Sequence, residues 1–409
     1  MFLSIISENE LKLLQTIRRN PGCTKSKLAS MVEMPWSSAY MAISKLNNKI
    51  IVRQDEDNSS NNLDGNNYRA SLYVNPEYEY YFGISVGSSQ LKVVLLGFDF
   101  SVVSFGTQQA SPHIKTFSKQ MEALNFMHPE NDFCKWCKDT PEKSNQLSDT
   151  LIAICESVCE LKEKGINVVA INFALPGHID FYNQIIVSTS HLCNESNFIK
   201  NSNISRLISS SMYARLNNKN IQVYVDHNVK SSAVAEKEFR FSFSSNKEDL
   251  IVLYLGRGVG SSMVINGSLY RDIDNISGQF GEITVFVNGK LEKLGDVIRK
   301  KIFPNTQFNP TIEDINSQLL IKSKKELLVY VLAQALNNFI HVVGIKDIIF
   351  SGKFDGLLDI IESDLNDELE NFGMYGINLH HSVYNQYSAA VGAAIGCFYN
   401  LYGIDYSWN

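Results

Sequence analysis

The sequence lacks the features of membrane-inserted and secreted proteins. No run approaches the roughly 20 apolar residues that a membrane-spanning helix requires. Residues 1–14 carry neither a basic start nor a small-residue cleavage site, and they pass straight into a charged amphipathic pattern, unlike a secretory signal. Seven cysteines, an odd number scattered from Cys23 to Cys397, do not make a disulfide framework. We therefore predict a cytoplasmic protein that does not enter a membrane.

Metal ligands are also sparse. Cys134 and Cys137 form one CxxC, and Cys155 and Cys159 lie one helical turn apart. Neither pair has a neighbouring histidine, and only the first has zinc-ribbon spacing. A zinc site at these cysteines remains an alternative, but the pattern favours ordinary thiols.

Length and charge indicate more than one domain. At roughly 100–200 residues per domain, 409 residues predict two or three domains. The net charge is −6, but residues 1–54 hold eight Lys and Arg against three Asp and Glu, a local charge of +5 that leaves −11 for the rest. A basic N-terminal segment on an acidic body indicates a polyanionic partner for that segment alone. The alternative is a solvated helical face.

The N-terminal segment has the pattern of three short helices. Ser7 and Glu10 form a capping box ahead of apolar residues at three-residue steps, and residues 20–22 (Asn-Pro-Gly) end this helix. Thr24 then caps a second helix, and Pro35, at a first-turn position, opens a third. Helices separated by such short turns predict a helix-turn-helix.

Two predicted strands follow, which would complete a wing. Residues 50–53 and 68–74 flank a polar stretch with an Asp64-Gly65 turn signal. Residues 1–76 are therefore predicted to be a winged helix-turn-helix that binds double-stranded DNA, with a protein-interaction module as the alternative. Pro76 and the tyrosine-rich stretch after it mark the boundary, and a second domain spans 78–409.

In a helix-turn-helix the third helix lies in the major groove, with its exposed side chains facing base edges. Ser37, Tyr40 and Ser44 are predicted to read bases, while cations mainly contact phosphate. The predicted DNA-facing residues are Trp36, Ser37, Ser38, Tyr40, Met41, Ser44, Lys45, Lys49, Arg53 and Arg69.

The second domain carries motifs in a recognisable order. FGISVGSSQLKVVLLG (82–97) and IVLYLGRGVGSSMVING (251–267) repeat one strand–glycine–strand plan in two halves. Five further motifs accompany these two segments: INFALPGHID, HNVKSSAVAE, GQFGE, IIFSGKF and SAAVGAAIGCFY. This set resembles the ROK family of repressors and sugar kinases. The resemblance implies an α/β fold: a two-lobed, actin- and sugar-kinase-like (ribonuclease H-like) domain. The last motif is a small-residue helix suited to core packing or, alternatively, a subunit contact.

Departures from the family pattern indicate lost catalysis. Ser85 stands where ROK kinases have an aspartate that organises metal and phosphate, and Asn228 replaces the aspartate that acts as general base, with His227 beside it. Arg257 replaces a small hydroxyl residue in the second glycine turn, whose glycines we interpret as close strand packing rather than an ATP site. We predict no enzyme activity and no cofactor. The alternative is an active kinase that uses Asp226 as base.

The family's structural zinc is also predicted to be absent, because residues 281–292 contain neither histidine nor cysteine. Glu282 and Glu292 match two sugar-contacting acids of the family, and His191 takes a position that asparagine usually holds. The residues predicted to contact a small effector, such as a sugar or sugar phosphate, are His191, His227, Asn228, Glu282 and Glu292.

Together these features predict a transcriptional regulator, a repressor of carbohydrate-related genes, that works as a homodimer or homotetramer. The effector would change the placement of the DNA-binding segments. Besides the active kinase, a ligand-independent architectural DNA binder remains an alternative.

Overall fold

The structure is a computed structural model, and it describes residues 6–54, 71–86, 91–103, 144–188, 202–208, 210–240, 249–256, 258–272, 277–304, 312–352 and 355–404. Among the predicted functional residues, Arg69, His191, Arg257, Cys134 and Cys137 lie outside these ranges, as do the side chains of Lys49 and Arg53.

The N-terminal residues 6–54 and 71–74, here called the head, contain three helices and three short strands. They are α1 (Glu8–Arg19), β1 (Cys23–Thr24), α2 (Lys25–Met31), α3 (Trp36–Ile50), β2 (Ile51–Gln54) and β3 (Ser71–Val74). The strands form an antiparallel sheet in the order β1-β3-β2. The predicted helices and the two predicted strands are confirmed. Strand β1 was not predicted, because two residues carry no periodic signal.

The caps that were predicted for the head helices are present. The Ser7 side chain accepts a hydrogen bond from the Glu10 amide, and the Glu10 carboxylate accepts one from the Ser7 amide, which completes the capping box. The Thr24 hydroxyl accepts from the Lys27 amide at the start of α2. These contacts satisfy amide groups that a helix start leaves without partners, so they fix where α1 and α2 begin.

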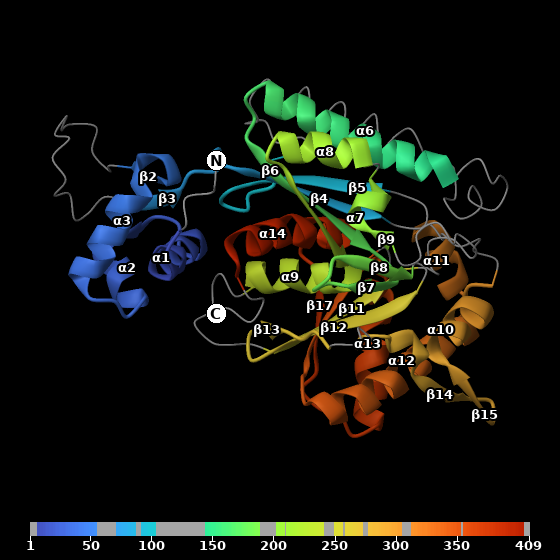
Figure 1. Cartoon of the computed structure of the whole chain (residues 1–409). Coiled ribbons are helices and arrows are strands. Elements are labelled where there is room, and N and C mark those ends of the chain that lie inside the picture. The colour runs from blue at the N-terminus through green and yellow to red at the C-terminus, as the bar shows by residue number, and fades with distance from the viewer. Residues whose placement is uncertain are drawn as a thin grey trace.

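The second domain has two lobes, each built on a mixed sheet (Figure 1). The first sheet has the order β10-β6-β4-β5. Its strands are β4 (Tyr80–Val86), β5 (Leu91–Gly97), β6 (Val168–Leu175) and β10 (Gln222–His227). One face is covered by α6 (Ser144–Glu163) and α8 (Ser210–Asn218), whose Cys155 and Leu216 share a core with Phe82 and Phe173. A small sheet of β7 (His178–Asp180), β8 (Ile185–Ser188) and β9 (Ser202–Asn203) and the helix α7 (Ile204–Leu207) complete this lobe.

The second sheet has the order β13-β12-β11-β16-β17. Its strands are β11 (Leu250–Leu255), β12 (Val259–Ile265), β13 (Ser268–Leu269), β16 (Asp347–Gly352) and β17 (Asn378–His381). In both lobes an antiparallel hairpin is followed by two parallel strands. The duplication predicted from the two strand–glycine–strand motifs is therefore confirmed.

The rest of the second lobe packs around this sheet. It comprises η2 (Phe280–Glu282), β14 (Thr284–Val287), β15 (Lys290–Lys293), α10 (Leu294–Val297), η3 (Ile298–Ile302), α11 (Ile312–Leu319), α12 (Lys322–Val343), η4 (Asp355–Leu357) and α13 (Leu358–Asn371). Among the described residues, α12 is long and apolar enough to span a membrane by length and composition. Its Leu328, Leu332 and Leu336 are buried in the core of the second lobe, so we interpret it as a core helix.

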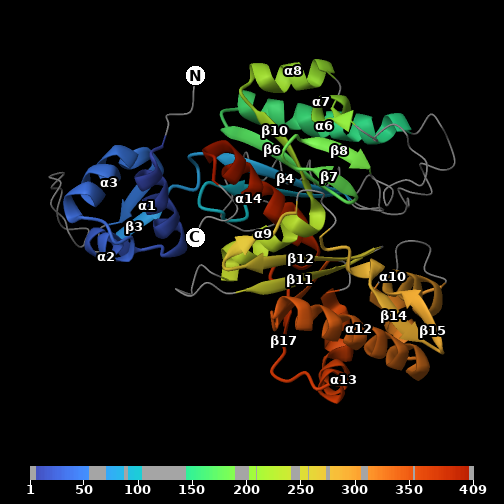
Figure 2. The ribbon, with the colours of Figure 1, turned by 60° about the horizontal axis from the view of Figure 1, so that its bottom comes forward.

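Two helices, α9 (Asn228–Arg240) and α14 (Ser388–Tyr402, after η5, Asn385–Tyr387), lie between the sheets (Figure 2). A Cβ atom on Gly392 would lie 1.6 Å from the Ser231 carbonyl oxygen, and one on Gly83 would lie 1.9 Å from the Ala390 carbonyl oxygen. Only glycine fits at these contacts, where α14 touches α9 on one side and β4 on the other. Core packing of the small-residue helix is thus confirmed.

Candidate functional site

The candidate site lies where β10 runs into α9. Ser85 and Asp226 both pair with Ala174 on the strand between them, so the three residues form one row across the sheet. Side chains in such a row project from the same face. This face is the one that packs on α14, because Ala174 contacts Ala389 and Ala393. The row therefore holds one carboxylate, Asp226, and a hydroxyl at the position where the kinase pattern has an aspartate.

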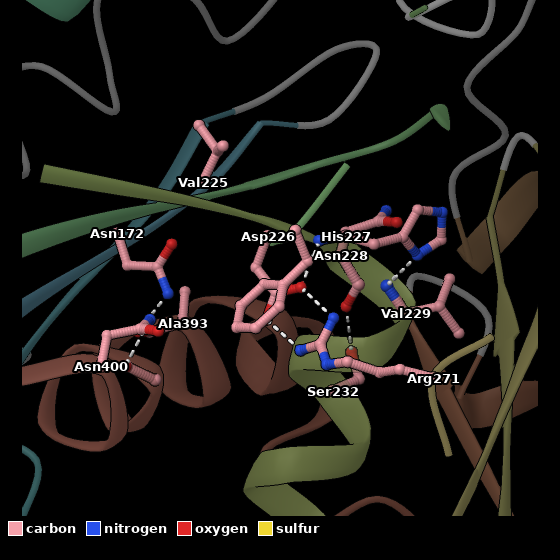
Figure 3. A network of polar contacts seen from close by, with 12 residues as sticks. Asn172, Val225, Asp226, His227, Asn228, Val229, Ser232, Arg271, Ala393 and Asn400 are labelled. Carbon is pink, nitrogen blue, oxygen red and sulfur yellow. Dashed lines mark hydrogen bonds and ion pairs between the residues drawn. The ribbon is translucent and has the colours of Figure 1, made fainter. Parts of the chain in front are cut away.

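Asp226 is held by a bidentate ion pair. Nη1 and Nη2 of Arg271 lie 2.8 and 2.6 Å from its two carboxylate oxygens, and the His227 amide donates to Oδ1 at 2.7 Å (Figure 3). The Asp226 and Arg271 side chains are only 1% and 5% exposed. The Arg271 guanidinium also stacks 3.9 Å from the ring centroid of Phe181. Both oxygens of Asp226 are thus occupied and shielded from solvent in this structure.

His227 and Asn228 form the start of α9. Nδ1 of His227 accepts from the Val229 amide at 3.3 Å, which makes His227 the N-cap of the helix. Asn228 is buried, and its backbone carbonyl accepts a hydrogen bond from the Ser232 hydroxyl at 3.1 Å. Both predicted effector residues therefore have structural contacts in this structure, and their contact with a ligand remains a prediction.

A second ion pair joins α9 to the segment that follows β13. Nζ of Lys230 lies 3.3 Å from Asp272 and 3.1 Å from the Ser277 hydroxyl, which also bonds Asp272. Burial lowers the pKa of Lys230, as does the nearby charge of Arg271, while Asp272 opposes this shift. Sequence reasoning missed Lys230, Arg271 and Asp272. No local motif marks them, because each partner lies more than 40 positions from the residue it contacts.

The two predicted carboxylates of the second lobe are each paired with a lysine. Glu282, on η2, lies 2.5 Å from Nζ of Lys293 and is 56% exposed. Glu292, on β15, pairs with Lys301 on η3. Gly260, on β12, lies between α9 and the segment that leads to Glu282. A Cβ atom on Gly260 would meet a methyl group of Val229, on α9, at 3.0 Å and the carbonyl oxygen of Gly278 at 3.7 Å. Glu292 belongs to the β14–β15 hairpin, at the end of the second lobe farthest from the head (Figure 1).

The glycines of the second glycine turn have different surroundings. A Cβ on Gly258 would meet nothing within 4 Å, and one on Gly256 would meet only the Tyr254 ring, at 3.5 Å. The interpretation of these glycines as close strand packing is therefore wrong for Gly256 and Gly258, and Gly260 is closely packed against the helix α9 rather than against a strand.

The predicted DNA-facing residues of α3 whose side chains the structure describes share one property, exposure to solvent. The exposed residues are Trp36, Ser37, Ser38, Tyr40, Met41, Ser44 and Lys45, whereas Ala39, Ala42, Ile43 and Leu46 are buried in the head core. Two of the exposed residues also contact their neighbours, because the Ser44 hydroxyl donates to the Tyr40 carbonyl at 2.8 Å and Lys45 lies 3.6 Å from Glu10. In addition, Nζ of Lys25 lies 5.3 Å from the centroid of the Tyr40 ring. Lys25 was not among the predicted residues.

Solved structures with this arrangement define the class of fold. A ROK family transcriptional regulator, described as a homolog of the E. coli MLC protein, superposes with a TM-score of 0.65 over 97% of this chain and 96% of its own, at 15% identity. A ROK family protein from Streptococcus pneumoniae TIGR4, solved in complex with sucrose, gives 0.51 over 78% of this chain and 98% of its own, at 16% identity. The second domain thus has the sugar-kinase-like fold.

Sequence comparison gives the family. A family model described as ROK family matches residues 133–294. The xylose repressor of Bacillus subtilis (strain 168) is 21% identical over 282 residues, which cover 69% of this chain and 61% of the relative. The xylose repressor of Staphylococcus xylosus is 20% identical over 285 residues, with the same coverage. The chain spans about 61% of the length of these curated relatives. Residues 133–294 thus match the ROK family, and the curated relatives and the solved structures are similar to the chain around them.

Proposed function

We propose that the chain is a DNA-binding transcriptional repressor of carbohydrate-related genes, with a winged helix-turn-helix at residues 1–76 and a sensor domain at 78–409. The observation that carries the proposal is α3, which presents a continuous set of exposed polar and aromatic side chains above a buried apolar face. A helix that presents such a face next to a short antiparallel sheet suits insertion into the major groove. The names of the xylose repressors and of the ROK regulator agree with this role.

The charge distribution supports DNA as the partner of the head. Residues 1–54 carry a net charge of +5 in a chain of net charge −6, and Lys45 remains exposed on α3 although Arg18 and Arg19 contact the second domain. Lys and Arg near α3 would neutralise phosphates and release counterions, while Ser37, Tyr40 and Ser44 would discriminate base edges. A homodimer or homotetramer in the cytoplasm would present two such heads to a pseudo-palindromic operator.

The sensor domain is proposed to bind a sugar or sugar phosphate near the start of α9. A related ROK protein was solved with sucrose, and the sequence relatives are named for xylose. His227, Asn228 and Glu282 are the described candidates, with Glu292 farther along the second lobe. The effector can switch the protein only if it binds the DNA-competent and incompetent arrangements with different affinity.

The site favours a sensor over a kinase. A general base must reach the proton that it removes, with its oxygen within hydrogen-bond distance. Asn228 is an amide, and Asp226, the base of the alternative hypothesis, is 1% exposed with both oxygens bound to Arg271. Ser85 supplies no metal-binding carboxylate in the same row. We therefore propose that the chain does not phosphorylate sugars.

Genome-wide mapping of binding sites, with the full chain and the Tyr40→Ala variant, tests this function. The full chain is expected at discrete sites near carbohydrate genes, and Tyr40→Ala is expected to lose preference for those sites over random DNA. Replacement of an exposed aromatic far from α3, Tyr375→Ala on the second lobe, is the matched control and should leave the sites unchanged. Absence of discrete sites for the full chain, or equal binding by a chain without residues 1–75, would contradict the proposal.

A further inference from the structure

One helix connects the candidate effector site with the head. The first turn of α9 holds Asn228 and Lys230, and Glu238 lies ten residues later, about 15 Å along the helix at 1.5 Å per residue. At that end Oε1 of Glu238 lies 3.2 Å from Nη2 of Arg19, the last residue of α1. The site and the head thus contact opposite ends of the same helix (Figure 2).

The contact between the head and the second domain is largely buried and chemically specific. The Glu238 and Arg19 side chains are 8% and 20% exposed, and the Tyr399 hydroxyl of α14 also hydrogen-bonds Glu238. Next to them, Arg18 donates from Nε and Nη2 to the Phe98 carbonyl, at 3.1 and 2.6 Å. A contact of this kind favours one orientation, because a guanidinium hydrogen bond is lost when its partner moves by about 1 Å or turns out of line with the N–H groups.

The guanidinium group of Arg18 also lies against aromatic rings of the second domain. Its guanidinium carbon lies 3.8 Å from the ring centroid of Phe100 and 4.2 Å from that of Phe398, on α14. The head is therefore fixed to both α9 and α14. Cation–π contacts of this type strengthen when they are shielded from solvent.

The backbones of the two helices are in direct contact, so we expect α9 and α14 to move together. Gly392 of α14 leaves no space for a Cβ atom against Ser231 of α9. Asn172 of β6 donates from Nδ2 to the Ala393 carbonyl at 3.0 Å, which ties α14 to the first sheet. A close-packed interior transmits a displacement because it cannot absorb it by compression.

We propose that α9 and α14 form a coupling unit, in which a change at the first turn of α9 repositions the head through Glu238, Arg19 and Arg18. Asp226 and Lys230 would report the state of the effector site, because their ion pairs with Arg271 and Asp272 hold the segment after β13 onto the start of α9. Glu238, Arg18 and Arg19 are positioning residues for the head. Their regulatory meaning rests on the proposed function, whereas the coupling itself can be tested without DNA or effector.

Hydrogen–deuterium exchange of the full chain tests the coupling. The double variant Asp226→Asn/Arg271→Met removes the ion pair at the site without leaving a buried charge. It is expected to raise amide exchange at the last turn of α1, residues 16–20, by about fivefold or more. In a Glu238→Gln background the same double variant should add a clearly smaller increase, because the contact between α9 and the head is already lost and only the contact of Arg18 with α14 remains.

The matched control is Glu236→Gln. Glu236 lies on the same helix and is equally buried, but its carboxylate bonds Arg240 and Ser382 rather than the head. In this background the double variant should raise α1 exchange as it does in the parent chain. Coupling is reciprocal, so Glu238→Gln alone should also raise exchange at the first turn of α9.

The comparison of exchange rates is informative only while the amides of α1 keep some protection from exchange. If Glu238→Gln removes this protection completely, the variant Tyr399→Phe, which lacks one hydrogen-bond donor to Glu238, is used in place of Glu238→Gln. Circular dichroism must show that every variant is folded. Unchanged α1 exchange in the double variant, or an equal increase in the Glu238→Gln background, would overturn the proposal.

A DNA-binding measurement separates this inference from the proposed function. Operator affinity is measured with and without D-xylose, D-glucose and their phosphates for the parent, Glu236→Gln and Glu238→Gln chains. Loss of the sugar response in Glu238→Gln alone supports the regulatory role, and an intact response there refutes it. If no chain binds DNA while the exchange rates remain coupled, the proposed function fails and the coupling stands.

Discussion

The ion pair between Asp226 and Arg271 gives the sharpest prediction about stability. The Asp226→Asn variant keeps the shape of the side chain but leaves the guanidinium of Arg271, 5% exposed, without its counter-ion. Removal of one partner from a buried pair costs about 3–5 kcal/mol, because the remaining charge stays desolvated. Asparagine can still accept one of the two hydrogen bonds, so we expect the lower end of this range, about 3 kcal/mol.

The magnitude can be checked by urea and thermal unfolding of the full chain. At about 2–4 °C per kcal/mol for a large domain, the expected decrease in the unfolding midpoint of the second domain is on the order of 10 °C. The double variant Asp226→Asn/Arg271→Met replaces the pair with groups that need no counter-ion and should recover most of this loss.

The matched control for this experiment is Glu282→Gln. It makes the same carboxylate-to-amide change in an ion pair whose side chains are 56% and 58% exposed, and it should not change the midpoint measurably. The reasoning fails if Asp226→Asn is as stable as the parent chain, or if the double variant is no more stable than the single one. The first result would mean that the ion pair does not stabilise the fold, and the second would mean that the unpaired guanidinium of Arg271 is not what destabilises the single variant.

Four further outcomes are expected. Incubation with ATP, magnesium and a panel of hexoses and N-acetylhexosamines should release no ADP above background, and turnover that disappears in Asp226→Asn would revive the kinase alternative. Metal analysis should find no stoichiometric zinc, whereas one zinc per chain that is lost on mutation of Cys134 and Cys137 would establish a site there. Glu282→Ala should abolish the response of DNA binding to the effector while DNA affinity stays intact. Loss of a charged hydrogen bond costs about 1.5–3 kcal/mol, which raises the Kd for the effector roughly ten- to a hundredfold. An unchanged response would show that Glu282 is not part of the effector site. Burial opposes the charge of Glu238, but Arg19 and neighbouring groups outweigh it and hold the pKa of Glu238 below the usual value. The charged Glu238 therefore stabilises the docked head fully above the pKa of about 4.3 that glutamate has in an unfolded chain, and this stabilisation is lost as the pH falls through the lower pKa of Glu238 in the folded protein. The rate of amide hydrogen exchange in α1, corrected for the intrinsic rate, should be constant from pH 5 to 8 and rise only in stronger acid.

The head was predictable because its signals are local. The capping box, the Thr24 cap and the proline that precedes α3 each act within four residues, and the exposed set on α3 follows from a single helical period. The docking of the head was not predictable. Arg18 and Arg19 contribute to the basic charge that indicated a polyanionic partner, yet they face Phe98 and Glu238 of the second domain.

The site was predictable in its position and not in its contacts. Motif order located the start of α9 and identified Asn228 as a departure from the kinase pattern. It could not show that Asp226 is paired, because Arg271 lies 45 positions later in a segment without a motif. The glycines show the same limit, since Gly392 has no room for a Cβ atom and Gly258 has ample room. Sequence alone does not distinguish a glycine required by packing from one in an open turn.

The composition of α9 makes a second argument for its role in coupling. Lys230, Glu236, Lys237 and Glu238 are all buried, although a helix that serves only as packing between two sheets could be apolar at lower desolvation cost. Three of these side chains make polar contacts outside α9: Lys230 with Asp272, Glu236 with Ser382, and Glu238 with Arg19. Apolar contacts tolerate sliding, whereas these polar contacts are lost when the helix shifts along its axis, so they fix the placement of the helix. A helix fixed by polar contacts at both ends can occupy a second position only by exchanging those contacts, and this is the property that a two-state switch requires.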